Sequence, residues 1–452
     1  MDVQQLKRIY FVGIGGIGMS ALARFFKQRG ATVSGYDRTE TDLTKKLVSE
    51  DIAVHYTDDI SLVDKEAELV VYTPAIPADQ KELNWYRDNG YKVYKRSDVL
   101  QWITEAMFAI TVGGTHGKTT ISTLTAYLLR ETGYGCNAFL GGISVNYESN
   151  YWSSDNNVAV IEADEYDRSF LKLFPDIAVL TAMDPDHLDI YGTPEQMEEA
   201  FIQYTKNIKP GGTLIAKHGL RRGHELESSK KITYSLQNDA ADVYATNIVQ
   251  QDGGYIFDIM GKGWMLQDIH LPIGGMHNVE NTVVAVTVAH LLEIDHTLIK
   301  KALAGFKGIK RRFEYVLKND KMVYIDDYAH HPEELAALIK SAKRLFPDRK
   351  CVVAFQPHLF SRTRDLADGF AESLDLADQV ILLDIYPARE LPMEGVTSQM
   401  IADRMGNPVH TILSKEGLLE FVKVAPLDLF ITAGAGDIDK LVQPIKEILE
   451  QK

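Results

Sequence analysis

The residues best suited to chemistry form a glycine-rich turn that ends in a lysine and two threonines. Backbone N–H groups in such a turn make a nest for phosphate oxygens, and the lysine brings positive charge to the β- and γ-phosphates of a nucleotide. The first threonine hydroxyl can ligate Mg²⁺. Val112 stands where the common G-x-x-x-x-G-K-[ST] motif has its first glycine, so this loop is shorter than the usual form. The pattern predicts a nucleoside triphosphate site, and the competing interpretation is a glycine turn with an incidental surface lysine. The turn reads Gly113-Gly114-Thr115-His116-Gly117-Lys118-Thr119-Thr120.

A second glycine turn lies near the N-terminus and matches G-x-G-x-x-G. It reads Gly13-Ile14-Gly15-Gly16-Ile17-Gly18. Between an expected strand and an expected helix, such a turn lets phosphate approach the backbone at a helix N-terminus. Asp37 follows the next expected strand, where a ribose-binding acid is typical. Taken alone, the turn predicts a dinucleotide site such as that for NAD, and the alternative is a turn whose glycines only permit close packing.

Acidic residues follow two further expected strands. Glu162-Ala163-Asp164-Glu165 closes the strand at 158–161, and Asp184-Pro185-Asp186-His187-Leu188-Asp189 follows the strand at 177–180. Carboxylates and an imidazole at neighbouring strand ends can share Mg²⁺ ions that bridge phosphate oxygens. We therefore expect a metal site here, and the alternative is a solvated acidic loop.

These motifs need elements that bring them together, and the hydrophobic pattern predicts three α/β segments. Short apolar runs that alternate with helical patterns indicate parallel sheets covered on both faces. In the second segment we expect the strand-rich region 231–273 to be antiparallel, and from residue 312 the alternation predicts a doubly wound sheet. The expected strands are 9–13, 31–36, 69–72, 107–112, 158–161, 177–180, 213–216, 322–325, 351–355, 380–385 and 429–433, and the expected helices are 19–29, 119–131, 279–292, 332–346, 366–376, 398–405 and one from 438.

Composition bounds the class of protein. The 452 residues suffice for about three domains of ordinary size. With 48 Lys and Arg against 63 Asp and Glu the net charge is −15, which argues against a nucleic-acid partner. Two cysteines are too few for a disulfide framework and indicate a reduced, cytoplasmic protein. We expect no membrane segment, because no apolar run is long enough and the glycines at 13–18 interrupt the stretch that imitates a signal peptide.

Taken together, the motifs resemble the Mur ligase family over essentially the whole chain. The resemblance rests on the turn at 113–120, Glu162 in its acidic motif, the segment 186–192 and His277-Asn278-x-x-Asn281 at a helix start. Markers of one branch of the family are the segments 326–332, 356–364 and 386–390. The resemblance implies an α/β chain of three domains. These are an N-terminal Rossmann-like domain at 1–105, a central P-loop ATPase-like domain with a mixed sheet at 106–311, and a C-terminal Rossmann-like doubly wound domain at 312–452.

The resemblance implies an activity in peptidoglycan precursor synthesis. ATP, with Mg²⁺ or Mn²⁺, would phosphorylate the lactyl carboxylate of UDP-N-acetylmuramate, and the amine of L-alanine would attack the acyl phosphate to leave ADP and phosphate. The first glycine turn then holds a UDP-sugar and not a dinucleotide. We expect a monomer or weak homodimer. The alternatives are a recycling ligase that adds a preformed tripeptide to the same UDP-sugar, a dinucleotide-dependent oxidoreductase, and a non-enzymatic nucleotide-binding module.

The resemblance also implies residue roles. The catalytic residues would be Lys118, His187 and Arg312. Thr119 and Glu162 would hold one Mg²⁺, and His187 a second, unless His187 is a hydrogen-bonded loop histidine. The UDP-sugar would contact Gly15, Gly16, Ile17, Gly18, Asp37, Thr73 and Ala75. ATP would contact Gly114, Thr115, His116, Gly117, Lys118, Thr119, Thr120, His277, Asn281, Arg312 and Asp327.

Three of these assignments have alternatives. His277 and Asn281 start a helix, so they are also explained as plain helix caps. Arg312 is also explained as a solvated hinge residue.

The resemblance places Tyr328, His330, Arg362 and Arg364 at the amino-acid site. A guanidinium binds a carboxylate through two hydrogen bonds, but the sequence does not decide between the two arginines. Leu359 stands where the family more often has a basic residue.

Overall fold

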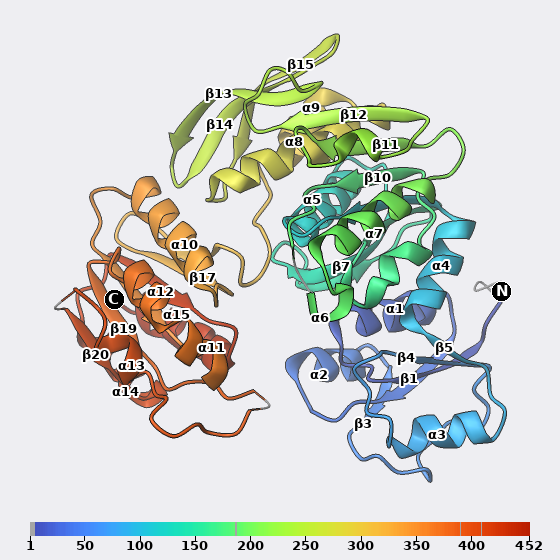
Figure 1. Cartoon of the computed structure of the whole chain (residues 1–452), viewed down its shortest axis with the longest axis horizontal. Helices are drawn as coiled ribbons and strands as arrows, with labels where there is room; N and C mark the ends of the chain where they lie inside the picture. Colours follow the sequence, from blue (N-terminus) through green and yellow to red (C-terminus); the bar gives the residue numbers. More distant parts are fainter. Residues whose placement is uncertain (1–4, 186–187, 389, 408) are drawn as a thin grey trace. The chain divides into compact units, whose positions relative to one another are not determined.

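The computed structural model describes residues 5–185, 188–388, 390–407 and 409–452 of an α/β chain with three sheets (Figure 1). His187 and Arg389 lie outside the described residues. The contacts divide the chain into two compact units. The first comprises residues up to 246 with 258–267 and 280–303, and the second comprises 247–257, 268–279 and 304–452. The domain boundaries expected at 105 and 311 stay a prediction.

The first sheet is five-stranded and parallel, in the order β3-β2-β1-β4-β5. Its central strand is an unbroken apolar run, Ile9-Tyr10-Phe11-Val12, buried on both faces as expected for a covered parallel sheet. The strands are β1 (Arg8–Val12), β2 (Thr32–Tyr36), β3 (Ala53–His55), β4 (Leu69–Tyr72) and β5 (Val93–Lys95). The helices are α1 (Ile17–Gln28), α2 (Asp42–Ser49), α3 (Lys81–Asp88) and α4 (Arg96–Ala106).

The central sheet has ten strands in the order β15-β14-β13-β12-β11-β10-β6-β9-β7-β8. Its strands are β6 (Phe108–Gly113), β7 (Asn137–Ser144), β8 (Ser149–Trp152), β9 (Val158–Glu162), β10 (Ile177–Leu180), β11 (Thr213–Lys217), β12 (Lys230–Ser235), β13 (Val243–Gln251), β14 (Gly254–Gly261) and β15 (Trp264–Leu271). Its helical elements are α5 (Lys118–Glu131), η1 (Tyr166–Lys172), α6 (Leu188–Tyr191), α7 (Pro194–Lys206), η2 (Gly223–Glu225), α8 (Met276–Leu291) and α9 (His296–Leu303).

The expectation that the whole region 231–273 is antiparallel was wrong for its first strand. Strand β12 pairs in parallel with β11 over five residue pairs and with β13 over two. Residues 218–229, between β11 and β12, are long enough for a chain crossing that returns to the same edge of the sheet. Strands β13, β14 and β15 are joined by two-residue connections, which suit antiparallel neighbours.

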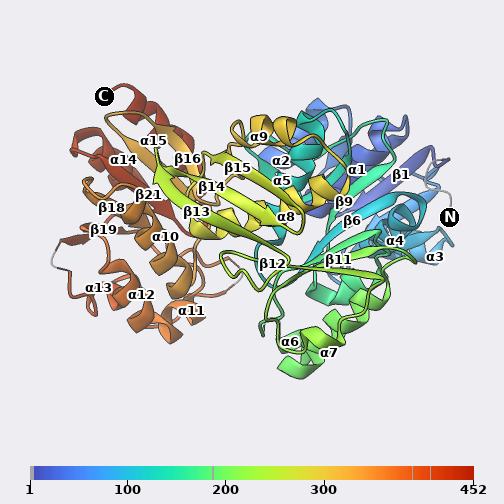
Figure 2. The same ribbon diagram turned by 90° about the horizontal axis from the view of Figure 1, so that it is seen from above.

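The third sheet has the order β16-β17-β21-β18-β19-β20 and is parallel except for β16. Tyr324 and Ile325, adjacent on β17, belong to cores on opposite faces, with α14 and α15 on one face and α10 and α12 on the other (Figure 2). The doubly wound prediction is confirmed, although it omitted β16, β20, α11 and α14. The strands are β16 (Glu314–Lys318), β17 (Val323–Asp327), β18 (Cys351–Phe355), β19 (Gln379–Leu382), β20 (His410–Ile412) and β21 (Leu429–Ala433). The helices are α10 (Pro332–Leu345), α11 (Phe360–Asp365), α12 (Ala367–Leu374), α13 (Gln399–Ala402), α14 (Lys415–Val424), η3 (Asp437–Leu441) and α15 (Val442–Glu450).

Helix α1, which follows the first glycine turn, is tied to the central sheet. The buried Arg24 donates from Nε to Glu50 Oε2 and from Nη1 to Asn150 Oδ1, both at 2.5 Å. Asn150, on β8, donates to the carbonyl of Ile17 at 2.5 Å. One hydrophobic core includes residues of both sheets, and the rings of Phe25 and Phe139 meet within it at 5.2 Å. The two glycine turns therefore stand in one packed unit.

We expect Gly35→Ala to destabilise this unit, because a Cβ there would lie 2.3 Å from the carbonyl oxygen of Phe11 on the neighbouring strand. The cost should be about 2 kcal/mol, a typical penalty for overpacking, and should lower the melting temperature by several degrees. Gly223→Ala is the control, since its Cβ would meet only Leu220 Cβ at 3.5 Å. Equal melting temperatures for the two variants would contradict this account.

Candidate active site

The turn between β6 and α5 adopts a conformation that requires glycine. Gly114 and Gly117 have φ values of +117° and +76°, in the region that side chains disfavour. A Cβ on Gly114 would also lie 2.2 Å from Thr181 Oγ1 and 2.7 Å from the backbone nitrogen of Ala182. The glycines therefore bring the turn against the end of β10, and α5 starts at Lys118, one residue before its predicted start.

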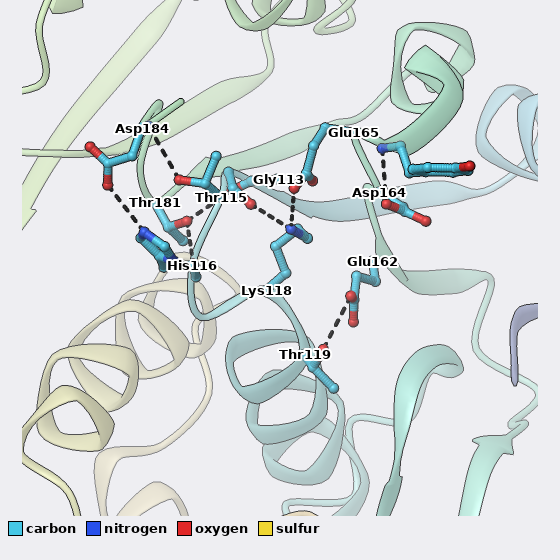
Figure 3. Close-up of polar contacts among 12 residues, drawn as sticks. Gly113, Thr115, His116, Lys118, Thr119, Glu162, Asp164, Glu165, Thr181 and Asp184 are labelled. Atoms are coloured by element: carbon cyan, nitrogen blue, oxygen red, sulfur yellow. Dashed lines mark hydrogen bonds and ion pairs between the residues drawn. The ribbon is translucent and has the colours of Figure 1, made fainter. Parts of the chain in front are cut away.

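The end of β10 holds the turn by hydrogen bonds (Figure 3). Thr115 N donates to the Ala182 carbonyl at 3.2 Å, and Thr181 Oγ1 donates to the His116 carbonyl at 2.5 Å. The backbone nitrogen of Asp184 donates to Thr115 Oγ1 at 3.2 Å, and the Asp184 carboxylate lies 3.2 Å from His116 Nε2. Because both side chains of that last pair are exposed, the pair contributes little to stability. The loop after β10 thus supports the turn.

Lys118 points back into the turn and toward the acidic motif (Figure 3). Its Nζ donates to the Gly114 carbonyl at 2.8 Å and to Glu165 Oε1 at 2.7 Å. The Glu165 side chain is only 1% exposed, so burial raises the pKa of its carboxyl group and Lys118 opposes that rise. Glu165 Oε2 is buried with no hydrogen-bond partner among the described residues. The sequence placed Glu165 in an acidic cluster and missed its pairing with the lysine.

Thr119 and Glu162 present oxygen atoms side by side. Thr119 Oγ1 donates to Glu162 Oε1 at 3.1 Å, and Glu162 Oε2 accepts from the backbone nitrogen of Gly141 at 3.1 Å. Mg²⁺ in proteins commonly takes one or two such oxygens and completes its shell with phosphates and water. These two residues therefore fit a magnesium ion that bridges to a nucleotide. His187, expected to hold a second ion, lies outside the described residues.

His277 and Asn281, which the sequence placed at a helix start, both lie inside α8. Asn281 lies beyond the first turn of the helix. A Cβ on Gly117 would be 2.8 Å from Asn281 Oδ1, so the amide touches the glycine turn at 113–120. His277 is also within the helix, so neither residue is its N-cap. His277 packs against Gly275, where a Cβ would lie 2.5 Å from its ring. His277 is exposed at the start of the helix.

The first glycine turn lies at the carboxyl edge of the first sheet. The backbone nitrogens of Gly13 and Ile14 donate to the Tyr36 carbonyl at 2.8 and 3.0 Å. Gly15 N donates to Asp37 Oδ2 at 2.8 Å, so the acid holds the turn directly. A Cβ on Gly13 would lie 3.2 Å from Thr73 Cγ2, which places the end of β4 beside the same turn. Gly16 precedes α1 as its N-cap, Ile17 and Gly18 open the helix, and Ala75 is exposed beyond β4.

In the second unit, Asp327 ends β17 and accepts hydrogen bonds from backbone nitrogens on both sides. Phe313 N donates to its Oδ2 at 2.6 Å and Ala329 N to its Oδ1 at 2.7 Å. Burial raises the pKa of Asp327 to about 6, against the lowering effect of these bonds and of the Arg312 charge. His277, Arg312 and Asp327, three of the expected nucleotide contacts, all belong to the second unit.

Histidine and tyrosine rings line the carboxyl edge of the third sheet. Tyr328 and His330 have ring centroids 5.2 Å apart, His330 and His358 6.2 Å, and His358 stacks on Tyr386 at 5.9 Å. Tyr328 is 43% exposed, so one side of this ring cluster is open to solvent. The aromatic groups come from three strand ends, which a parallel sheet collects at one edge.

The two candidate arginines on α11 differ in their surroundings. Arg362 Nη1 is buried without a hydrogen-bond partner among the described residues. Arg364 is half-exposed, and its Nε donates to Asp365 Oδ1 at 2.7 Å. A buried, unpartnered donor is costly unless a ligand satisfies it, whereas Arg364 already has a carboxylate. The geometry therefore favours Arg362 as the anion-binding residue. Leu359, before the helix, has φ +71°.

Three family models match successive parts of the chain. The Mur ligase family catalytic domain matches residues 8–107, the Mur ligase middle domain residues 112–289, and the Mur ligase glutamate ligase domain residues 311–436. With its three α/β sheets and its phosphate turn, the chain belongs to the Mur ligase family. The family uses ATP.

Relatives extend over the full length of the chain. A UDP-N-acetylmuramate–L-alanine ligase of Cytophaga hutchinsonii is 48% identical, covering 100% of this chain and 99% of that protein. One of Flavobacterium johnsoniae is 46% identical over 100% of both. The crystal structure of a UDP-N-acetylmuramate-alanine ligase of Thermotoga maritima has a TM-score of 0.83 at 28% identity, covering 99% of this chain and 100% of that one. A murein peptide ligase of Psychrobacter arcticus shares the fold, at 22% identity and a TM-score of 0.66.

We expect Glu165→Gln to tighten ATP binding by about threefold or more, because the phosphates no longer compete with a buried carboxylate for Lys118. Calorimetric titration with ATP measures this change. Asp167→Asn is the control, since Asp167 belongs to the same segment and pairs with Lys95 at 3.7 Å. Weaker ATP binding by the Glu165 variant would show that the carboxylate supports the site and does not compete within it.

Proposed function

We propose that the chain joins L-alanine to the lactyl carboxylate of UDP-N-acetylmuramate in peptidoglycan precursor synthesis, with ATP converted to ADP and phosphate. The observation that carries this proposal is the 48% identity, over the full length, to a UDP-N-acetylmuramate–L-alanine ligase. It is combined with a glycine turn whose Lys118 pairs with Glu165 and whose Thr119 contacts Glu162. The Thermotoga maritima structure, which is 28% identical and shares the fold, is also a UDP-N-acetylmuramate-alanine ligase.

The chemical problem is that a carboxylate is a poor electrophile. Transfer of the γ-phosphoryl group to it gives an acyl phosphate, the neutral amine of L-alanine attacks, and the tetrahedral intermediate expels phosphate. Catalysis of this kind relies on positioning and on neutralising developing charge. Lys118 would serve the β- and γ-phosphates once ATP draws it from Glu165. Mg²⁺, held by Thr119 and Glu162, would neutralise phosphate charge.

The other expected residues take roles that their positions support. The N-terminal turn with Asp37, Thr73 and Ala75 would hold the UDP-sugar, as a glycine turn before a helix holds phosphate elsewhere. Asn281, against Gly117, and His277 would meet the adenosine part of ATP, and Arg312 and Asp327 would contact ATP from the second unit. His187 as ligand of a second Mg²⁺ stays a prediction from the sequence.

The cellular setting is also proposed. We infer a cytoplasmic enzyme that works as a monomer or weak homodimer, without nucleic-acid or membrane partners. Among the described residues, helices that combine the length and the apolar character needed to span a membrane are absent. The net charge of −15 supports the inference about nucleic acid.

The function is tested by phosphate release from ATP. We expect release only when UDP-N-acetylmuramate and L-alanine are both present, and Lys118→Ala should reduce the rate by about 10³ or more because charge stabilisation at the phosphates is lost. Release with a tripeptide but not with L-alanine would select the recycling ligase, and NAD(P)H oxidation would select the oxidoreductase. ATP binding without release under any acceptor would select the non-enzymatic module.

The two arginines of α11 provide a matched test of the amino-acid site. We expect Arg362→Ala to raise the KM for L-alanine by about 10² because a charge-assisted carboxylate contact is removed. Arg364→Ala should change that KM by less than about threefold, because Arg364 is exposed and paired with Asp365. Steady-state kinetics at saturating ATP measures both. The reverse ranking would assign the carboxylate to Arg364.

A further inference from the structure

Arg96 lies against the first glycine turn, although it is distant from that turn in the sequence. A Cβ on Gly18 would be 2.9 Å from Arg96 Nη1 and 3.2 Å from its Cδ. The guanidinium therefore packs directly against the backbone of Gly18. The side chain is 21% exposed, so its charge is partly shielded from water and yet reachable by a ligand.

The fold explains how Arg96 reaches the turn. Strand β5 pairs in parallel with β4, and β4 pairs in parallel with β1, so their carboxyl ends meet at one edge of the sheet. Arg96 comes directly after the last residue of β5 and opens α4. Helix stability does not explain a cation there, because the positive end of a helix dipole disfavours one. An arginine at this place in the sequence is therefore not explained by the stability of α4.

The two glycine turns differ in where their positive charge comes from. In the second turn, Lys118 is the first residue of α5 and supplies the charge. Helix α1 begins with Ile17, Gly18 and Met19, none of which is charged. Arg96 places a guanidinium beside the first turn from the end of β5, and the residues of that turn carry no charge.

The partners of Arg96 leave its donors available. Its Nη2 lies 3.7 Å from Asp164 Oδ2, which is longer than a hydrogen bond, and Asp164 is 41% exposed. An exposed ion pair at this distance contributes little. The part of the chain that the structure describes gives this guanidinium no closer anion than Asp164. A structural ion pair is therefore a weak explanation for the residue.

We propose that Arg96 binds the diphosphate of the sugar nucleotide at the first glycine turn. This inference rests on the proposed function, because it takes the ligand of that turn to be a UDP-sugar. A guanidinium presents a planar fork of N–H donors that matches two phosphate oxygens, and the N-terminus of α1 adds backbone N–H groups on the same side.

Direct binding to the purified full chain tests the proposal. The probes are UDP, UDP-N-acetylmuramate and UDP-N-acetylglucosamine, which is the same sugar nucleotide without the lactyl group. We expect Arg96→Gln to raise the Kd of all three by about 10-fold or more and to leave the Kd of ATP within about twofold. Arg96→Lys keeps the charge but not the fork and should lose less. Arg87→Gln is the control. Arg87 lies on α3 with its guanidinium over the Tyr72 ring, and this variant should bind like the wild type.

Three outcomes would overturn the proposal, and a fourth would overturn the proposed function on which it rests. Equal loss of ATP and UDP affinity, with a lowered melting temperature, would show that Arg96 only supports the fold. Loss of affinity for UDP-N-acetylmuramate alone would assign Arg96 to the lactyl carboxylate and not to the diphosphate. Unchanged binding of all three probes would remove Arg96 from the site. If the wild type itself fails to bind UDP, the proposed function fails, which is a different result.

Discussion

The position of Lys118 in the glycine turn depends on the buried carboxylate of Glu165. The pair at 2.7 Å fixes the ammonium group beside the Gly114 carbonyl. The carboxylate reaches the turn because β9 lies beside β6 and its last residues continue into η1. Tyr191 donates to the Glu165 carbonyl at 2.7 Å and fixes that backbone. Glu162, three residues earlier, faces Thr119 instead, so one short motif serves both the cation and the metal-binding oxygen.

The first and central sheets share a core, which makes them one support for two anion sites. Arg24 is buried between Glu50 and Asn150, and breaking such a network would leave a charge without partners. The two glycine turns are thereby attached to one packed body. A phosphoryl group can pass between two substrates only if their reacting atoms are placed to within a fraction of an ångström, and a shared core supplies that rigidity.

The sequence predicted what depends on local pattern and missed what depends on strand neighbours. Strands β18 and β21 have the predicted bounds because a buried apolar run between polar ends needs no partner to be recognised. The parallel pairing of β12 was missed because the alternation of apolar and polar residues along a strand does not show which strand lies beside it. The spacing within Glu162–Glu165 likewise could not say which acid faces Lys118. Arg362 and Arg364 could not be ranked until α11 fixed which guanidinium is buried, since residues two apart on a helix point different ways.

An acidic chain can build anion sites because charge acts locally. The net charge of −15 is spread over the molecule, whereas a phosphate near a strand end responds to groups within about a Debye length. At both glycine turns an acid lies beside the cation, Glu165 beside Lys118 and Asp164 beside Arg96. Each acid would compete with a bound phosphate for its cation. A phosphate would displace Glu165 from Lys118, a buried pair at 2.7 Å, at a greater cost than Asp164 from Arg96, an exposed pair at 3.7 Å. The two turns would therefore differ in how much binding energy a phosphate spends on displacing the acid.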